Sequence, residues 1–179
     1  MNIFSCFFIT GVNGAGKSTL VPLLIKMLPR GYKVIDFDQR GVPNNVDVKW
    51  RQKTTRHWLQ TARRNTQKNV HTVICGLSKP REIYAIATKK QKSNIHVAFL
   101  DVSSSQIEKR LRQRISSPLK VKNLKEVTGL TLRACIAANI QHAKELRKEC
   151  KKYHCKVFNT TSATPKRTAV KVTHWILRS

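Results

Sequence analysis

The sequence predicts an α/β protein, a three-layer α/β/α domain with a five-stranded parallel sheet at its centre. Five short apolar segments alternate with longer segments in which apolar residues recur at helical spacing. A glycine-rich loop connects the first apolar segment to the first helical one. Right-handed crossovers between such strands make a parallel sheet with helices on both faces. We therefore expect residues 1–179 to form one domain of this kind.

The expected strands are short apolar runs, most of them rich in β-branched and aromatic residues, which is typical of strands buried on both faces. They span residues 3–9, 33–37, 71–75, 95–100 and 155–158. A loop over residues 41–45 follows the second strand, because this stretch contains glycine, proline and two asparagines.

The expected helices lie between the strands. Residues 20–28 form the first, because four leucines and one methionine are spaced at i, i+3, i+4, i+7 and i+8. Pro22 lies early in this helix, so we expect a local distortion and not a break. Further helices are expected over residues 49–67, 81–90, 103–115, 132–146 and 165–177. Residues 116–126 contain Pro118 and several lysines, and predict a mobile loop.

The chain is strongly basic, with 35 Lys and Arg residues against 9 Asp and Glu residues and a net charge of +26. The charge is spread along the chain, since residues 49–68 and residues 109–125 each carry seven basic side chains. Such a charge attracts polyanions and speeds their encounter with the protein. A nucleic-acid partner and an ordinary solvated basic surface both remain open.

The apolar runs and the cysteines give expectations about the compartment. The longest apolar run is much shorter than the roughly 20 residues that a membrane-spanning helix needs, so we expect no membrane segment. The five cysteines form no C-x-x-C pair and show no disulfide or zinc spacing. This usage favours a reducing compartment, and hence a cytoplasmic protein.

The glycine-rich loop matches the pattern G-x-x-x-x-G-K-[ST] at each fixed position. The loop and the residue after it are Gly11, Val12, Asn13, Gly14, Ala15, Gly16, Lys17, Ser18 and Thr19. Glycines let successive backbone N–H groups surround a β-phosphate, and the following helix adds a favourable dipole. Lys17 is expected to contact the β- and γ-phosphates, and the Ser18 hydroxyl to ligate Mg²⁺. The motif therefore predicts binding of ATP or another nucleoside triphosphate with Mg²⁺.

With this loop, the sequence resembles the P-loop kinases of small molecules and nucleotides, in particular the adenylate, shikimate and gluconate kinase families. The resemblance implies a P-loop NTPase domain that transfers the γ-phosphate of ATP to a hydroxyl or phosphate of a small metabolite, nucleoside or nucleotide. It also implies a small lid after the fourth strand, here residues 108–126, with arginines that hold the transferred phosphate. Arg110 and Arg114 are four residues apart and share a helix face, so both are candidates for this catalytic role.

Asp36 and Asp38 lie two residues apart at the end of the second strand, so strand geometry places them on the same face. The resembling shikimate and gluconate kinases have a similar Asp-x-Asp at this point. Asp38 is the candidate to accept a proton from the acceptor hydroxyl, and Asp36 the candidate to orient Mg²⁺; both are expected to contact the substrate. The third strand departs from the pattern because it ends in Cys75 and Gly76, without an acid. Asp101, at the end of the fourth strand, is a weaker alternative.

Residues after the 41–45 loop lie where the resembling kinases bind their acceptors. Arg51 is a candidate for an anionic group of the substrate, and Trp50 or Trp58 for stacking on a base. Core packing of the tryptophans and a solvated Arg51 remain equally open. Residues 159–162, after the last strand, correspond to the stretch that lies against the adenine in the resembling enzymes.

Three functions fit these features. The first is an ATP-dependent kinase of a small molecule, nucleoside or nucleotide. The second is a polynucleotide 5′-hydroxyl kinase, which uses the same machinery and would hold its strand on the basic surface. The third is a nucleotide-dependent binding or switch protein without an acceptor, and the two aspartates argue against it.

Overall fold

The computed structural model describes residues 5–43 and 46–179. Its five strands form one sheet, in which every pairing is parallel and the order is β2-β3-β1-β4-β5. The strands are β1 (Cys6–Thr10), β2 (Tyr32–Asp36), β3 (His71–Cys75), β4 (Ile95–Asp101) and β5 (Lys156–Asn159). The expected five-stranded parallel sheet is therefore confirmed. Ile3 and Phe4 of the expected first strand, and Asn44 and Asn45 of the expected loop, lie outside the described residues.

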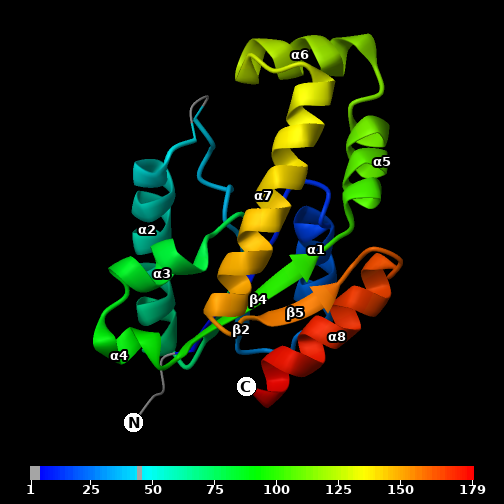
Figure 1. Ribbon diagram of the computed structural model, residues 1–179. Helices are drawn as coiled ribbons and strands as arrows, with labels where there is room; N and C mark the ends of the chain where they lie inside the picture. The colour runs from blue at the N-terminus through cyan, green and yellow to red at the C-terminus, as the bar shows by residue number, and fades with distance from the viewer. Residues whose placement is uncertain (1–4, 44–45) are drawn as a thin grey trace.

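Strand β1 is the centre of the sheet, and alternate side chains on it face two separate cores. Phe7 packs edge-on against Trp175 of the last helix, at 5.5 Å between ring centroids. The next residue, Phe8, belongs to the other core cluster, with Trp58 and Leu59 of the second helix. Both faces are therefore covered, which is the three-layer arrangement expected from the sequence (Figure 1).

The helices follow the expected order. They are α1 (Lys17–Met27), α2 (Val48–Thr66), α3 (Pro80–Ile86), α4 (Lys89–Lys92), α5 (Ser104–Arg114), α6 (Pro118–Thr128), α7 (Leu132–Lys152) and α8 (Pro165–Arg178). Helix α1 continues through Pro22, so the helix is not broken. The single helix expected over residues 81–90 is two helices, because Ala87 is extended and Thr88 caps a new one.

The expectation of a loop over residues 116–126 is wrong, because most of this stretch is helix α6. Ser117 accepts a hydrogen bond from the Lys120 N–H as the N-cap, and Pro118 occupies the first turn, where it is tolerated. Gly129 ends the helix in the left-handed conformation. Helix α6 lies across the top of the molecule between the ends of α5 and α7 (Figure 1). It has no buried residue, so it rests on the fold rather than within it.

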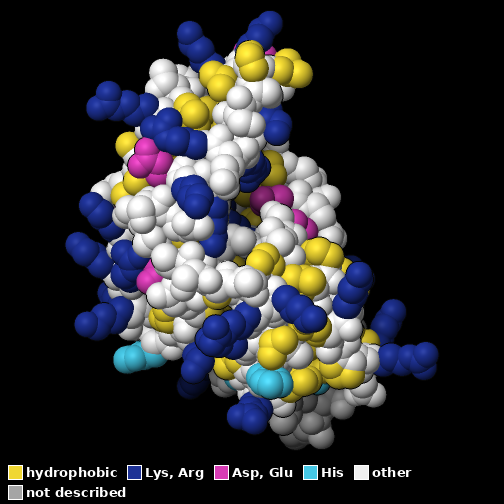
Figure 2. All heavy atoms as spheres, turned by 90° about the vertical axis from the view of Figure 1, so that its right-hand side faces the viewer, with side chains coloured by type: hydrophobic (Ala, Val, Ile, Leu, Met, Phe, Trp, Pro, Cys, Tyr) yellow, Lys and Arg dark blue, Asp and Glu magenta, His cyan; other side chains and the backbone are white. Residues whose placement is uncertain are grey.

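The basic residues cover the surface widely. Figure 2 shows Lys and Arg side chains scattered over the visible face, with few acids between them and hydrophobic side chains at the α6 end. Within residues 5–43 and 46–179, no helix combines the length and the apolar character needed to cross a bilayer.

Candidate active site

The glycine-rich loop connects β1 to α1 at the carboxyl edge of the sheet, where β1 lies between β3 and β4. Gly16 has a φ of 100°, in the left-handed region, so a side chain there would strain the backbone. A Cβ atom on Gly11 would lie 2.9 Å from the Cβ of Ala15. These contacts explain why the loop needs glycine at both positions, and they give it the geometry of a P-loop at a helix N-terminus.

Lys17 folds back over this loop. Its Nζ atom donates a hydrogen bond to the Val12 carbonyl oxygen at 2.9 Å. Burial lowers the pKa of Lys17 to about 8; the Asp38 and Asp36 carboxylates oppose this shift, and the Arg114 charge adds to it. Lys17 is thus a cation held near positive neighbours and little water, an environment that an incoming phosphate would stabilise.

A cavity of about 480 Å³ opens beside the P-loop. Its wall is formed by the loop and first turn of α1, by one aspartate after β2, by the end of α5 and by the segment between β5 and α8. The lining residues are Asn13, Gly14, Ala15, Gly16, Lys17, Ser18, Thr19, Leu20, Asp38, Arg110, Gln113, Arg114, Thr160, Ala163, Pro165 and Thr168. The size suits a nucleotide-sized ligand.

This cavity brings together most of the residues that the sequence predicted. The P-loop residues from Asn13 to Thr19 line it, together with Asp38, Arg110 and Arg114. Gly11 and Val12 are buried and do not line it. Asp36 and Arg51 do not line it either.

The two aspartates after β2 have different surroundings. The strand ends at Asp36, whose Oδ1 accepts a hydrogen bond from the Asp38 N–H at 2.9 Å. Asp38 therefore lies in a turn, not on the strand, and only its side chain reaches the cavity. Partial burial raises the pKa of Asp38, the neighbouring Asp36 carboxylate raises it further, and Lys17 opposes both. A carboxylate with a raised pKa is suited to accept a proton.

Arg110 and Arg114 of α5 also differ. The Nη1 of Arg110 donates to the Gly14 carbonyl at 2.8 Å, and its Nη2 donates to the Thr160 carbonyl at 2.6 Å. Two of its nitrogens are thus occupied by backbone groups, and burial lowers its pKa. Arg114 is exposed on the cavity wall, and its charge acts on Lys17. Arg114 is therefore better placed to meet a phosphate.

Arg51 makes a buried ion pair and not a solvated or substrate-facing one. Its Nε and Nη2 each donate to a carboxylate oxygen of Glu82 on α3 at 2.8 Å. Hydrogen bonding to Glu82 raises the pKa of Arg51, and the Glu82 charge acts in the same direction. The sequence analysis placed Arg51 at the substrate, but the structure places it between α2 and α3, because its partner Glu82 lies 31 residues away and was not visible from the sequence.

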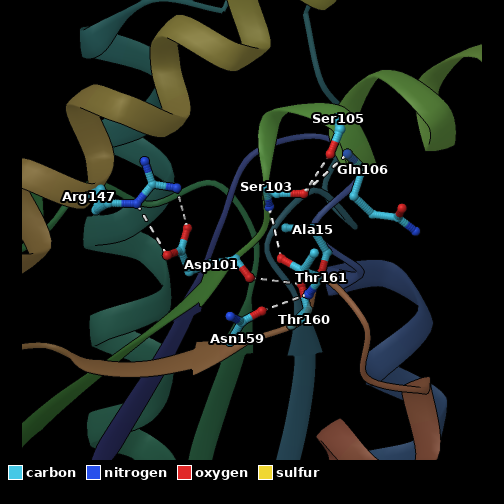
Figure 3. Close-up of polar contacts among 9 residues, drawn as sticks. All are labelled: Ala15, Asp101, Ser103, Ser105, Gln106, Arg147, Asn159, Thr160 and Thr161. Carbon is cyan, nitrogen blue, oxygen red and sulfur yellow. Dashed lines mark hydrogen bonds and ion pairs between the residues drawn. The ribbon is translucent and has the colours of Figure 1, made fainter.

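The tryptophans and Asp101 also have structural partners. Trp50 packs edge-on against Phe37, and the Trp58 Nε1–H donates to the Phe37 carbonyl at 3.1 Å, which favours core packing over base stacking. Asp101 is held by Arg147, whose Nη2 donates to its Oδ1 at 2.6 Å (Figure 3). Neither these tryptophans nor Asp101 line the cavity.

Two polar residues that sequence reasoning missed support the loop. Asn139 of α7 accepts a hydrogen bond from the Asn13 N–H through its Oδ1 at 3.2 Å. Thr160 donates through its hydroxyl to the Ala15 carbonyl at 3.2 Å and to the Asp101 carbonyl at 3.1 Å (Figure 3). The signal for Asn139 was its position in the apolar stripe of α7, where an unpaired amide is unfavourable.

The residues present fit a magnesium ion bound with a nucleotide. Mg²⁺ keeps several waters and takes few protein ligands when it binds with phosphates. The Ser18 hydroxyl is exposed on the cavity wall, and the Asp38 carboxylate lines the same wall. Among residues 5–43 and 46–179, no group of three or more His, Cys, Asp or Glu side chains gathers into a metal cage.

Comparisons with known proteins place the fold. No protein-family model and no curated protein matches the chain. A gluconokinase from Sinorhizobium meliloti 1021 is similar in structure, with a TM-score of 0.60 and 13% identity over 99% of this chain and 94% of that one. A shikimate kinase from Aquifex aeolicus vf5 aligns with a TM-score of 0.54 and 15% identity over 97% and 96% of the two chains.

A third similar chain comes from the Pnkp1/Rnl/Hen1 RNA repair complex. It aligns with a TM-score of 0.55 and 11% identity, over 83% of this chain and 46% of that one. At such identities the likeness is one of fold. With its parallel sheet, its glycine-rich loop and these neighbours, the chain has the fold of the P-loop kinases of nucleotides and small molecules.

Proposed function

We propose that this protein is an ATP-dependent kinase that transfers the γ-phosphate to a hydroxyl or phosphate group of a small metabolite, nucleoside or nucleotide. The observation that carries the proposal is the convergence of Lys17, Ser18, Asp38 and Arg114 on one cavity. Each of these residue types has a distinct task in phosphoryl transfer, and positioning and charge neutralisation provide most of the catalysis.

The P-loop performs the binding step. Its N–H groups receive the β-phosphate, and Lys17 leaves the Val12 carbonyl to contact the β- and γ-phosphates. Ser18 would hold Mg²⁺, which supplies charge neutralisation on the phosphate oxygens when it is bound. Thr160 and Arg110 keep the loop in shape from below.

Asp38 and Arg114 act on the transferred group. The acceptor oxygen forms a bond to the γ-phosphorus while the bond from that phosphorus to the β–γ bridging oxygen breaks, which releases ADP. For a hydroxyl acceptor, Asp38 takes the proton, which its raised pKa favours. Arg114 neutralises charge that spreads over the γ-phosphate oxygens in the transition state.

The test is a phosphate-transfer screen with γ-labelled ATP over sugars, hydroxy acids, nucleosides and nucleoside monophosphates. Transfer to at least one class, with loss of transfer in Lys17→Ala, is the expected result. Lys26→Ala is the matched control, since Lys26 is an exposed lysine on the same helix. Nucleotide binding without transfer to any acceptor, including nucleic acid, would favour the switch protein instead.

A second candidate is a polynucleotide 5′-hydroxyl kinase. The net charge of +26 favours it, because a polyanionic strand is attracted to such a surface. The likeness to a chain of an RNA repair complex is compatible with it. Transfer to 5′-hydroxyl oligonucleotides but not to free nucleosides would establish this candidate, and the reverse result would exclude it.

A further inference from the structure

Three consecutive residues of the P-loop are held by side chains from three later parts of the chain. The Asn13 N–H donates to Asn139 of α7, the Gly14 carbonyl accepts from Arg110 of α5, and the Ala15 carbonyl accepts from Thr160. The three bonds measure 3.2, 2.8 and 3.2 Å. Each bond fixes a peptide group of the segment that must surround a phosphate.

The Asn139 amide has a defined orientation. Its Nδ2 donates to the Cys135 carbonyl, one turn earlier on α7, at 2.9 Å. Because the NH₂ group is used there, the Oδ1 atom must face the P-loop, where it accepts from Asn13. The side chain is 9% exposed, so both bonds form with little competition from water.

Helices α5 and α7 flank α6 in the chain and in space, and α5 packs against α7. Figure 1 shows α6 lying between the ends of these two helices. Arg110 therefore holds Gly14 from the helix before α6, and Asn139 holds Asn13 from the helix after it. A displacement of α7 that accompanies movement of α6 must act on the Asn13 peptide group through this bond.

We propose that Asn139 is a positioning residue that couples the P-loop to α6. This inference rests on the proposed function, since it assigns α6 the role of a cover over the bound nucleotide. When phosphates fill the loop, the Asn13 peptide group shifts toward them, and Asn139 passes the shift to α7 and α6. Asn139 contacts no reacting atom, so its effect is on nucleotide affinity and on the response of α6.

The experiment measures two quantities in the full-length protein: the affinity for a non-hydrolysable ATP analogue with Mg²⁺, and hydrogen exchange of residues 117–129. Wild type is compared with Asn139→Leu, which keeps the side-chain volume but has no acceptor. Gln141→Leu is the matched control, because Gln141 is an exposed amide on the same helix and contacts Glu145.

The expected result has two parts. Asn139→Leu weakens analogue binding roughly tenfold, the scale of one buried hydrogen bond, and the analogue no longer slows exchange in α6. Gln141→Leu behaves as wild type. A structural role alone would lower the melting temperature and leave both quantities unchanged in the folded protein, and that outcome overturns the proposal.

A second variant covers the case in which Asn139→Leu does not fold. Asn139→Asp keeps the oxygen that accepts from Asn13 and is expected to keep the α6 response. Loss of this response in Asn139→Asp, with the P-loop still protected by the analogue, contradicts the coupling. A wild-type protein that binds no nucleotide contradicts the proposed function itself, and with it this inference.

Discussion

The ammonium group of Lys17 lies 2.9 Å from the carbonyl oxygen of Val12, five residues earlier in its own loop. This bond satisfies one of the lysine's three donors while burial lowers its pKa to about 8. A group in this state has more to gain from a phosphate than an exposed lysine has. Lys17 is therefore the residue whose loss should matter most.

Lys17→Ala should abolish phosphate transfer, because it removes the positive contact to the β- and γ-phosphates. Turnover of labelled ATP measures the effect, against the exposed control Lys26→Ala. If turnover per folded molecule is the same in both variants, Lys17 has no role in transfer.

Nucleotide affinity should decrease as the pH rises through about 8, because Lys17 loses its proton there in the free protein. A bound phosphate favours the charged lysine, so binding near and above pH 8 should take up a proton. Calorimetry in two buffers of different ionisation enthalpy measures this uptake. Lys17→Met should show none; equal uptake in both proteins would assign the proton to another group.

Asp38→Asn should reduce the transfer rate to a hydroxyl acceptor roughly 10²-fold or more, the usual scale for loss of a general base. In wild type, the rate should fall as the pH drops through the Asp38 pKa, which lies above the ordinary aspartate value. The stability change has the opposite sign. A raised pKa means that ionised Asp38 destabilises the fold at neutral pH, so Asp38→Asn should raise the melting temperature. A lower melting temperature with an unchanged rate would show a structural carboxylate.

Arg114→Ala should lower the transfer rate more than it weakens ATP binding, because its charge acts mainly in the transition state. Separate measurements of kcat and of the dissociation constant for an ATP analogue test this. Arg112→Ala is the control, since Arg112 is exposed on the same helix and pairs with Glu108. Equal loss of affinity and rate in Arg114→Ala would assign it to ground-state binding.

Arg51→Ala should destabilise the fold by about 3–5 kcal/mol, because it leaves the Glu82 carboxylate buried without its partner. Urea unfolding measures the loss. Replacing both residues together, as in Arg51→Met with Glu82→Leu, should restore much of the stability, because the orphaned charge is gone. Transfer activity per folded molecule should stay near wild type in the double variant. A raised KM for the acceptor with unchanged stability would support the substrate contact expected from the sequence.

Local patterns predicted the parallel sheet and the P-loop well, because both depend on neighbouring residues. Strand burial appears as apolar runs, and the loop's glycines are required by its own backbone geometry. The helix α6 was missed although Ser117, Pro118 and Gly129 are ordinary capping signals. Its lysines and lack of an apolar stripe made the segment look like a loop.

The site was predicted only where one segment supplies it. Asp38 and Arg114 were found because they follow strands or lie on a helix next to the P-loop. The partners of Arg51 and Asn13 could not be found, since Glu82 and Asn139 are 31 and 126 residues distant. Such long-range pairs leave no periodic signal in one sequence.

The end of β3 has a consequence for how this site can change by mutation. A Cβ atom on Gly76 would lie 2.0 Å from the Cβ of Phe37, whose carbonyl also accepts from Trp58. An acidic side chain at this point would therefore require Phe37 and its packing to move as well. Evolution or a protein engineer could add a carboxylate there only through several coupled substitutions, each unfavourable until the others are present.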